Sequence, residues 1–500
     1  MLTVGVRSAF RAPPDAGGPG HEIGQAPFPL FILSRMTLSE EYADALVIFG
    51  ISGNLAFKKI FPALENLERR GRLPPTVVGV ARGTTREAVI ERMRASLAQH
   101  DPDTDRETLR RLETKLVTVD GDYRDAATFA ALRDALGGAR RPMYYLAIPP
   151  SLFTTVAAKL GESGCAAGAR VVVEKPLGRD LSSAQTLNRA LRAVFTEDSI
   201  FRIDHFLGKE PVQNLLYFRF ANSFVEPVWN RNYIDNIQIT MAESFGVEGR
   251  GRLYEELGAI RDVVQNHLLQ VLAILAMEPP LDMRPASLRD EKTKVLRAVR
   301  PADRRDVVRG QYRGYRAEAG VQANSDVETF AALRLDIDSW RWADVPFLVR
   351  TGKRMPVTAT EVMATFRRPP QRLFEKTPPF RGNYLRFRLG PDRVAIALGV
   401  RVKAAGETMS GREIELFACN SQADEMTPYE RLLGDALRGD GALFARQDSV
   451  EVAWSIVDRM LANGPQAEPY EPGSWGPASA DRLAESVGGW HQPQDDGPCA

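Results

Sequence analysis

The first half of the chain carries short, unbroken runs of apolar residues. They lie at residues 45–49, 77–81, 143–148 and 171–173. Unbroken runs of this length are typical of strands buried on both faces of a parallel sheet. Helical patterns separate them, and a long one spans residues 182–195. This alternation of strands and helices predicts an open α/β domain over residues 41–203.

The second half of the chain has a different pattern, because apolar and polar residues alternate one by one. This alternation occurs at residues 236–243, 332–337, 384–389 and 394–402. It is typical of strands with one buried and one exposed face. We therefore predict a larger α+β domain over residues 204–490, built on a big, mostly antiparallel sheet.

The two ends of the chain lack both patterns. Residues 1–40 are broken by Pro and Gly, and so are residues 491–500, so we expect a flexible extension and a flexible tail. For the extension, a targeting peptide is one alternative, because Arg7 and Arg11 precede its first acidic residue. Initiation at Met36 is another.

Composition narrows the class of protein. Five hundred residues favour two domains, and a net charge of +1 gives no indication of nucleic-acid binding. The three cysteines are far apart in the sequence, which favours a reducing compartment over a disulfide or zinc framework. No apolar run is long enough to cross a membrane. We expect a cytoplasmic protein with no membrane or nucleic-acid partner.

A glycine-containing turn, GISGNLA at residues 50–56, follows the first apolar run. Glycines between a strand and a helix let the backbone approach a pyrophosphate, and the helix start favours its charge. This makes the first domain Rossmann-like, with a dinucleotide cofactor. The predicted cofactor-binding residues of this turn are Gly50, Ser52, Gly53, Asn54 and Leu55. A tight turn that binds nothing is the alternative.

Two basic residues follow later strands of the same domain. Arg82 ends the second strand, where an arginine suits the 2′-phosphate of NADP and a carboxylate would suit NAD. Lys175 follows the apolar run at residues 171–173, at the sheet edge where such folds bind ligands. We therefore predict NADP as cofactor. An ordinary surface arginine and an ordinary surface lysine are the alternatives.

The string RIDHFLGKE at residues 202–210 combines an acid, an imidazole and a lysine. His205 and Lys209 suit a phosphate group, because one offers a directional donor and the other a mobile charge. Asp204 accepts hydrogen bonds only, so it needs a cationic or N–H partner.

That partner is predicted in a second string, RDVVQNH at residues 261–267. His267 is a candidate general base near neutral pH. On an α-helix, five positions rotate a side chain by roughly 140°, so Asp262 and His267 should not bond to each other directly. We therefore expect Asp204, from another element, to orient His267.

These strings, together with GISGNLA and VVVEKPLG, closely resemble the signatures of the glucose-6-phosphate dehydrogenase family, and the resemblance spans residues 42–477. It implies oxidation of glucose 6-phosphate at C1 to 6-phosphoglucono-1,5-lactone with NADP, the first step of the oxidative pentose phosphate pathway. It also implies a homodimer or homotetramer, and no metal.

The resemblance assigns roles to individual residues. It implies that His267 removes the C1 hydroxyl proton while Asp204 supports it. At the substrate it places His205, Lys209, Glu243, Asp262 and Lys353, and it places Lys175 between the substrate and the cofactor, in contact with both. It adds Asp122 and Tyr123 to the cofactor residues, although a solvated turn is the simpler interpretation of these two.

Four positions depart from the family pattern. Asn54 replaces an aspartate of the glycine turn, Phe206 a phosphate-contacting tyrosine, Thr358 a basic residue and Gly390 a glutamine. A missing hydrogen bond to a charged group costs about 1.5–3 kcal/mol. From the last three departures we therefore expect weaker binding of glucose 6-phosphate than is typical of the family, or a shifted sugar preference. The alternatives are a dehydrogenase of another sugar or sugar phosphate, and a non-catalytic sensor, which should lack the base or its partner.

Overall fold

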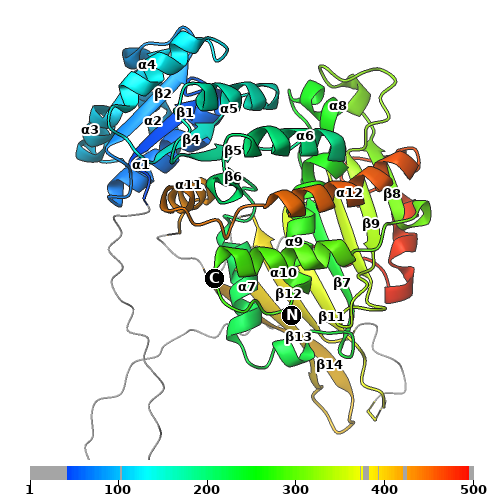
Figure 1. The fold of residues 1–500 in the computed structure, drawn as a ribbon. Coiled ribbons are helices and arrows are strands. Elements are labelled where there is room, and N and C mark those ends of the chain that lie inside the picture. Colours follow the sequence, from blue (N-terminus) through cyan, green and yellow to red (C-terminus); the bar gives the residue numbers. More distant parts are fainter. Residues whose placement is uncertain are drawn as a thin grey trace, which may run out of the picture.

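The computed structural model describes residues 42–101, 104–371, 373–374, 382–391, 394–420 and 425–494. The predicted extension at residues 1–40 lies outside the described residues. Two sheets organise the chain, one in each lobe of the molecule (Figure 1).

The first sheet has six parallel strands in the order β3-β2-β1-β4-β5-β6. This is the strand order of the Rossmann fold. Each strand of the central pair is fully buried, as the unbroken apolar runs predicted. The strands are β1 (Ala45–Phe49), β2 (Thr76–Ala81), β3 (Leu116–Asp120), β4 (Pro142–Leu146), β5 (Arg170–Val173) and β6 (Ile200–Arg202).

Helices connect these strands and cover both faces of the sheet. They pack two separate apolar clusters against it, one on each side. The α- and π-helices of this domain are η1 (Ala56–Ile60, a π-helix), α1 (Phe61–Arg69), α2 (Arg86–His100), α3 (Arg106–Lys115), α4 (Ala126–Leu136), α5 (Phe153–Glu162) and α6 (Leu181–Arg192).

The second sheet has nine strands in the order β14-β13-β12-β11-β7-β10-β9-β8-β15. It is mixed, because β7 pairs with β10 and β8 with β15 in parallel, whereas the other neighbours are antiparallel. Its strands are β7 (Ile234–Ala242), β8 (Val307–Tyr312), β9 (Phe330–Leu335), β10 (Phe347–Gly352), β11 (Ala359–Phe366), β12 (Tyr384–Gly390), β13 (Val394–Lys403), β14 (Gly411–Asn420) and β15 (Glu468–Tyr470).

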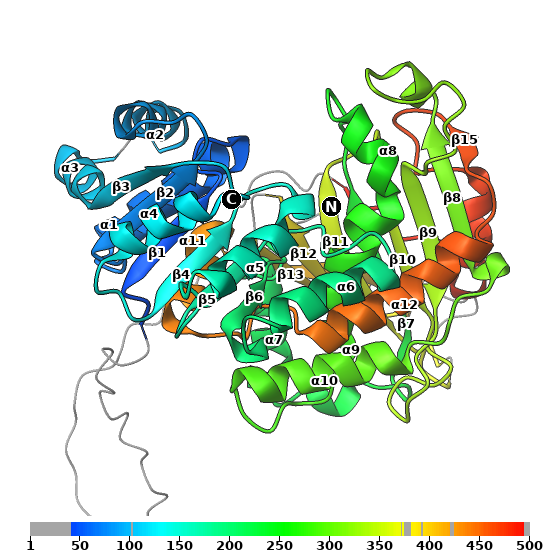
Figure 2. The same cartoon turned by 45° about the horizontal axis from the view of Figure 1, so that its top comes forward.

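A layer of helices lies across one face of this sheet (Figure 2). Its apolar side chains form the largest core of the molecule. The α- and π-helices of this half are α7 (Glu210–Ala221), α8 (Gly251–Ala259), η5 (Ile260–Leu268, a π-helix), α9 (Leu269–Ala276), α10 (Pro285–Ala298), α11 (Pro428–Arg438) and α12 (Gln447–Asn463).

The expectation of one exposed face is wrong for the middle of this sheet. Strands β7 and β10 are buried on both faces. The reason is the C-terminal segment, which runs over the second face and hydrogen-bonds to it. Gln238 donates to Gly489 O at 3.1 Å, and Arg350 donates to His491 O at 2.6 Å. Polar residues of these strands therefore have partners in the tail.

His491, at the start of the predicted flexible tail, is held in place. Its Nε2 lies 2.5 Å from an oxygen of Glu361, and that carboxylate is buried and needs partners.

Cys165 is buried and free, whereas Cys419 is disulfide-bonded, which the cysteine spacing did not predict.

Helix α11 crosses from the second half of the chain back to the first domain (Figure 1). Leu433 and Leu437 join an apolar cluster of the first domain, and Ala43 N donates to Leu437 O at 2.8 Å. The two domains therefore share a core at this point.

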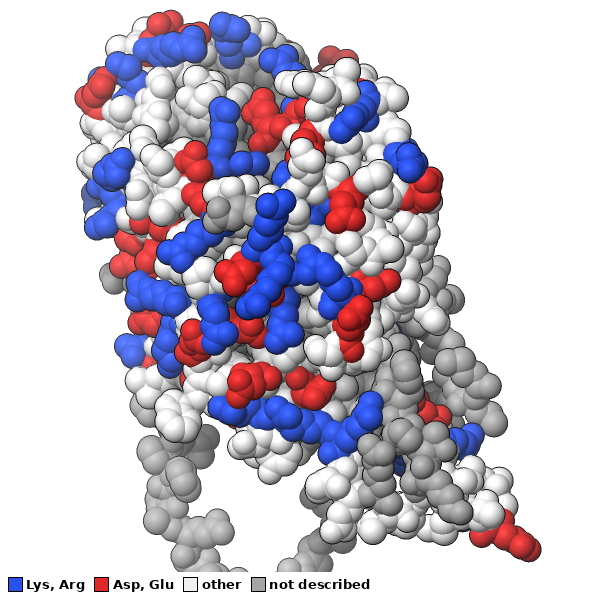
Figure 3. Space-filling model, turned by 90° about the vertical axis from the view of Figure 1, so that its right-hand side faces the viewer, with Lys and Arg blue, Asp and Glu red and all other residues white. Residues whose placement is uncertain are grey.

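None of the described helices is long and apolar enough to cross a bilayer. Basic and acidic side chains are interspersed on the face shown in Figure 3.

Candidate active site

The glycine turn has the shape that a dinucleotide needs. Gly50 has a φ of +82°, and a Cβ there would lie 2.3 Å from Ala147 O, so only glycine fits. Gly53 N donates to Gly50 O at 2.9 Å, which closes the turn. Ser52 and Asn54 are exposed at the sheet edge and Leu55 is partly buried. The turn opens directly into η1, so its backbone N–H groups and the helix start fit a pyrophosphate.

The other predicted cofactor residues of the first domain lie at neighbouring strand ends. Arg82 follows β2, its side chain is 79% exposed, and its Nη1 lies 3.3 Å from Asp122 Oδ2. Tyr123 OH donates to Val80 O at 3.2 Å. Arg82 and Asp122 therefore form a surface pair beside the turn, and Asp122 offsets part of the arginine charge.

Asp204 and His267 meet in the interior, although 63 positions separate them. His267 Nδ1 lies 2.5 Å from Asp204 Oδ1, and both residues are buried. Asp204 Oδ1 also accepts from Phe206 N at 3.0 Å. Burial alone would raise the pKa of Asp204, but its interaction with His267, hydrogen bond included, and the charge of Lys175 reverse this and lower it. Asp204 is therefore an ionised carboxylate.

The segment that carries Asp262 and His267 is a π-helix, not the α-helix that we assumed. A π-helix closes its hydrogen bonds between residues five apart, which brings these two residues to the same side. They do not bond to each other, but Lys175 joins them. Its Nζ lies 3.1 Å from Asp262 Oδ1 and 3.2 Å from His267 Nε2.

These contacts assign the protons of His267. The carboxylate of Asp204 accepts from Nδ1–H, so Nε2 carries the free lone pair and accepts from Lys175. Burial lowers the pKa of His267; Asp204 opposes the shift, and Lys175 adds to it. His267 is thus neutral at physiological pH, with Nε2 available as a base.

The predicted phosphate-binding residues lie beside this pair. The His205 and His267 rings are 4.7 Å apart edge to face, and Lys209 Nζ lies 4.3 Å from the centre of the Phe206 ring. Burial, with the neighbouring His267 and the charge of Lys175, lowers the pKa of His205 to about 3. His205 is therefore neutral and can offer a hydrogen bond, while Lys209 supplies the charge. A Cβ on Gly390 would lie 3.8 Å from Lys209 Nζ. This departure from the family pattern therefore lies beside the predicted phosphate-binding lysine.

Glu243 and Lys353 lie together at the ends of the parallel strands β7 and β10. Lys353 Nζ donates to Glu243 Oε2, and Lys353 is buried. The charges of Lys175 and Lys353 lower the pKa of Asp262 against the effect of its burial. Thr358 holds the adjoining turn, because Ser244 N donates to Thr358 Oγ1 at 3.0 Å. Glu243, Lys353 and Asp262 thus form one charged group, and Asp262 connects it to Lys175.

Sequence reasoning missed a buried network behind this cluster. Glu174 accepts from Tyr145 OH at 2.6 Å and bonds to Tyr429, whose ring stacks on His205 with a 6.4 Å separation of centroids. Burial raises the pKa of Glu174. Tyr429 belongs to α11 and lies far from every motif in the sequence, so no local signal marked it.

Among the described residues, one group has donor atoms close enough to hold a metal ion. It consists of Asp204, His205 and His267, whose ligand atoms lie within 4.8 Å of one another. Asp204 and His267 already bond to each other, and the ammonium of Lys175 contacts His267 Nε2. A positive charge at that atom opposes a cation. The cluster therefore suits proton transfer better than metal binding.

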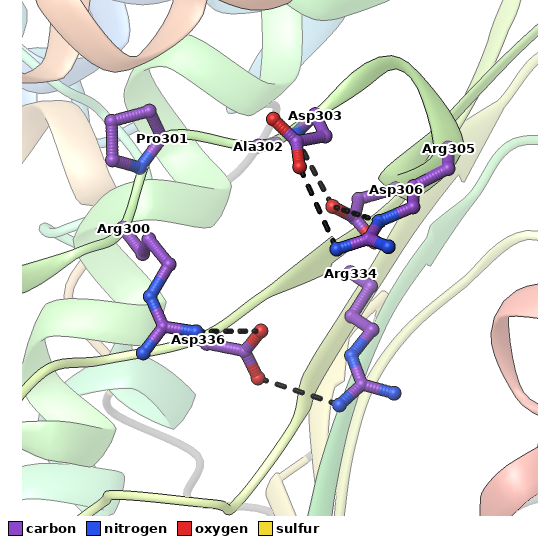
Figure 4. A pocket seen from close by; sticks show the side chains of 8 residues that line it. All are labelled: Arg300, Pro301, Ala302, Asp303, Arg305, Asp306, Arg334 and Asp336. Carbon is purple, nitrogen blue, oxygen red and sulfur yellow. Dashed lines mark hydrogen bonds and ion pairs between the residues drawn. The ribbon is translucent and has the colours of Figure 1, made fainter.

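A pocket of about 390 Å³ lies elsewhere and contains none of the predicted residues (Figure 4). Its arginines are paired with its own aspartates: Arg334 lies 3.6 Å from Asp336, and Arg305 lies 3.6 Å from Asp303. These pairs offset the charges within the pocket, so it lacks the unpaired polar groups of a ligand site.

A Rossmann sheet with an open glycine turn, and a buried imidazole–carboxylate pair joined to its edge by Lys175, define a two-domain, dinucleotide-dependent dehydrogenase. The chain matches the family model for the glucose-6-phosphate dehydrogenase NAD binding domain at residues 47–214. It matches the C-terminal domain model of the same family at residues 216–491. The chain belongs to the glucose-6-phosphate dehydrogenase family.

Individual members of this family are similar to the chain over nearly its whole length. The chain is 44% identical over 456 residues to glucose-6-phosphate 1-dehydrogenase 1 of Mycobacterium tuberculosis, a match that covers 90% of this chain and 97% of the relative. A crystal structure of the Mycobacterium avium enzyme matches with a TM-score of 0.85 and 43% identity, over 91% of this chain and 99% of that one. A glucose-6-phosphate dehydrogenase in complex with glucose-6-phosphate matches with a TM-score of 0.83 and 35% identity, over the same shares.

Proposed function

We propose that the protein oxidises glucose 6-phosphate at C1 to 6-phosphoglucono-1,5-lactone, with NADP as hydride acceptor. The observation that carries this is the contact of His267 with Asp204 on one side and with Lys175 on the other. It brings His267, Asp204 and Lys175 into one cluster, which supports roles as base, orienting carboxylate and positioning lysine. The family relationship supplies the substrate class.

The proton steps follow from these contacts. The C1 hydroxyl approaches His267 Nε2 and replaces the hydrogen bond from Lys175. His267 then takes the hydroxyl proton, and Asp204 stabilises the imidazolium that forms. Hydride acceptance is the chemistry that the nicotinamide supplies when it is bound. Lys175 remains bonded to Asp262, which holds it beside the reacting carbon.

We assign NADP, not NAD, on the position of Arg82. It follows β2, where the ribose of the cofactor binds in this fold, and its guanidinium is exposed. Replacing Arg82 with Ala should raise the KM for NADP and leave the KM for NAD nearly unchanged. Equal effects on the two cofactors would contradict contact with the 2′-phosphate.

The first experiment is a substrate panel followed by NADPH absorbance, with glucose 6-phosphate, free glucose and other hexose phosphates supplied in parallel with NADP and NAD. A second candidate, a dehydrogenase of another sugar phosphate, has a specific basis. The phosphate position has the phenyl ring of Phe206 under Lys209 in place of a hydroxyl. Faster turnover of a different sugar would favour that candidate, and no turnover of any sugar would favour a sensor.

We also propose a homodimer or homotetramer. β14 is an edge strand of the large sheet, and it leaves Leu416 49% exposed. Exposed edge strands in natural proteins are usually covered or protected. Light scattering coupled to gel filtration measures the assembly, and a monomer at micromolar concentration would contradict the proposal.

A further inference from the structure

Arg92, on the second turn of α2, lies beside the glycine turn of the neighbouring segment. Its Nη2 is 3.4 Å from Gly53 O and 3.5 Å from Asn54 Oδ1. The guanidinium carbon lies 5.0 Å from the centre of the Phe57 ring, so the two side chains form a cation–π contact. Arg92 therefore contacts two residues of the turn, Gly53 and Asn54, and the ring of Phe57, which follows the turn.

The positive charge of Arg92 is not neutralised. Both of its hydrogen-bond acceptors are neutral oxygens, and its Nε is buried without a hydrogen-bond partner in the part of the chain that the structure describes. Within that part, no carboxylate forms an ion pair with it. An arginine stays charged at every physiological pH, so this charge acts on any group that approaches the turn.

Asn54 explains why the charge is free. An aspartate at this position would place a carboxylate oxygen where Asn54 Oδ1 lies, 3.5 Å from Arg92 Nη2. That distance is within ion-pair range, and the pair would cancel much of the arginine charge. The amide keeps the shape of the side chain and removes its charge.

We infer that Arg92 is a cofactor-binding residue, and that its charge, left unpaired by Asn54, strengthens binding of the dinucleotide pyrophosphate at the glycine turn. This rests on the proposed dehydrogenase function. The position favours the pyrophosphate over the 2′-phosphate, because Arg92 contacts residues 53 and 54, whereas Arg82 stands at the end of β2. The loss of a carboxylate at position 54 thus leaves the charge of Arg92, on the adjoining helix, available to the cofactor.

The test is equilibrium binding of NADPH and NADH to the full chain, followed by ligand fluorescence without turnover. Replacing Arg92 with Gln should weaken both ligands by a similar factor, about tenfold for the loss of one charge beside a phosphate in a partly solvated site. Replacing Arg92 with Lys keeps the charge and should restore most of the affinity. The salt dependence of the dissociation constant should fall in the Arg92→Gln variant.

Arg94 provides a matched control two positions further along the same helix. It is paired with Glu113 at 2.6 Å, and its side chain is 59% exposed. Arg94→Gln changes the net charge equally and should leave both dissociation constants unchanged. An equal loss of dinucleotide affinity in both arginine variants would show that the net charge of the protein, not the position of Arg92, determines the affinity.

Other outcomes would overturn the inference. Unchanged affinity in a folded Arg92→Gln variant would remove Arg92 from the site. A loss confined to NADPH would assign Arg92 to the 2′-phosphate and refute the pyrophosphate contact. If the unaltered protein bound neither dinucleotide, the proposed function itself would fail, which is a distinguishable result. Thermal unfolding of each variant shows whether the fold is intact.

Discussion

Lys175 Nζ lies 3.2 Å from His267 Nε2, the atom that we expect to take the substrate proton. The lysine therefore occupies the lone pair of the base before the sugar arrives, and its charge keeps the imidazole neutral. Asp204 acts on the opposite nitrogen and favours the charged form. The base is thus set between one group that lowers its pKa and one that raises it.

This balance predicts the pH dependence of the Lys175→Met variant. The rate constant kcat/KM falls on the acid side as His267 becomes protonated, and burial and Lys175 hold the pKa of His267 below its ordinary value. Removing the ammonium should raise that pKa, so the acid limb should move to higher pH. A pH profile between 5 and 8 measures this. Lys353→Met is the control, because Lys353 contacts Glu243 and not the base. An acid limb that stays in place would contradict the assignment.

Replacing His267 with Asn should remove the base and keep a polar side chain of similar reach. General-base catalysis contributes about 10²–10⁴-fold, so kcat should fall by roughly that factor while substrate affinity changes little. Replacing Asp204 with Asn should also lower kcat, because the imidazolium loses its counter-charge. Steady-state kinetics at saturating NADP separate kcat from KM. Turnover near the unaltered level in His267→Asn would eliminate this mechanism.

Replacing Phe206 with Tyr tests the departure at the phosphate position. Phe206 is buried, its ring lies under Lys209, and it is 5.3 Å from the His267 ring. An added hydroxyl that reaches the phosphate should lower the KM for glucose 6-phosphate by roughly tenfold, the lower end for a hydrogen bond to a charged group. Phe206→Leu, which keeps an apolar side chain, should not lower the KM. An unchanged KM in the tyrosine variant would show that another group already compensates.

Local patterns in the sequence were sufficient to predict the parallel sheet and its glycine turn. The runs that became β1, β2, β4 and β5 are continuous and apolar because helices cover both faces of that sheet. The burial of β7 on both faces could not be predicted in this way. It depends on residues near the C-terminus, such as Gly489, whose own sequence carries no strand or helix pattern.

The residues of the site were predicted from motifs, but their geometry was not. In an α-helix, Asp262 and His267 would lie on different sides, whereas the π-helix brings both side chains to Lys175. A π-helix has no distinct sequence pattern, since it differs from an α-helix by a single step in its hydrogen bonds. Tyr429 escaped notice for another reason: it approaches His205 through the crossing of α11 between the domains.

Glu65 provides a test of stability in the first domain. It is fully buried on α1 and lies beside Asp101. Burial, with the neighbouring acids Asp101 and Asp105, raises its pKa from 4.5 to about 7. The folded protein therefore keeps this proton between pH 4.5 and 7, whereas the unfolded chain releases it. The resulting free-energy cost grows as the pH rises through this window and is complete above pH 7.

Replacing Glu65 with Gln should remove that cost. The variant should gain on the order of 2 kcal/mol in free energy of unfolding at pH 8, and almost nothing at about pH 4, where both the folded protein and the unfolded chain largely keep the proton. Urea denaturation of both proteins at the two pH values measures the difference, and other titrating groups cancel in the comparison. Glu68→Gln is the matched control on the same helix. Glu68 is paired with Arg111 at 3.0 Å, so its loss should destabilise the protein at pH 8. A gain from Glu65→Gln that is equal at both pH values would mean that repacking, not the carboxylate charge, is responsible.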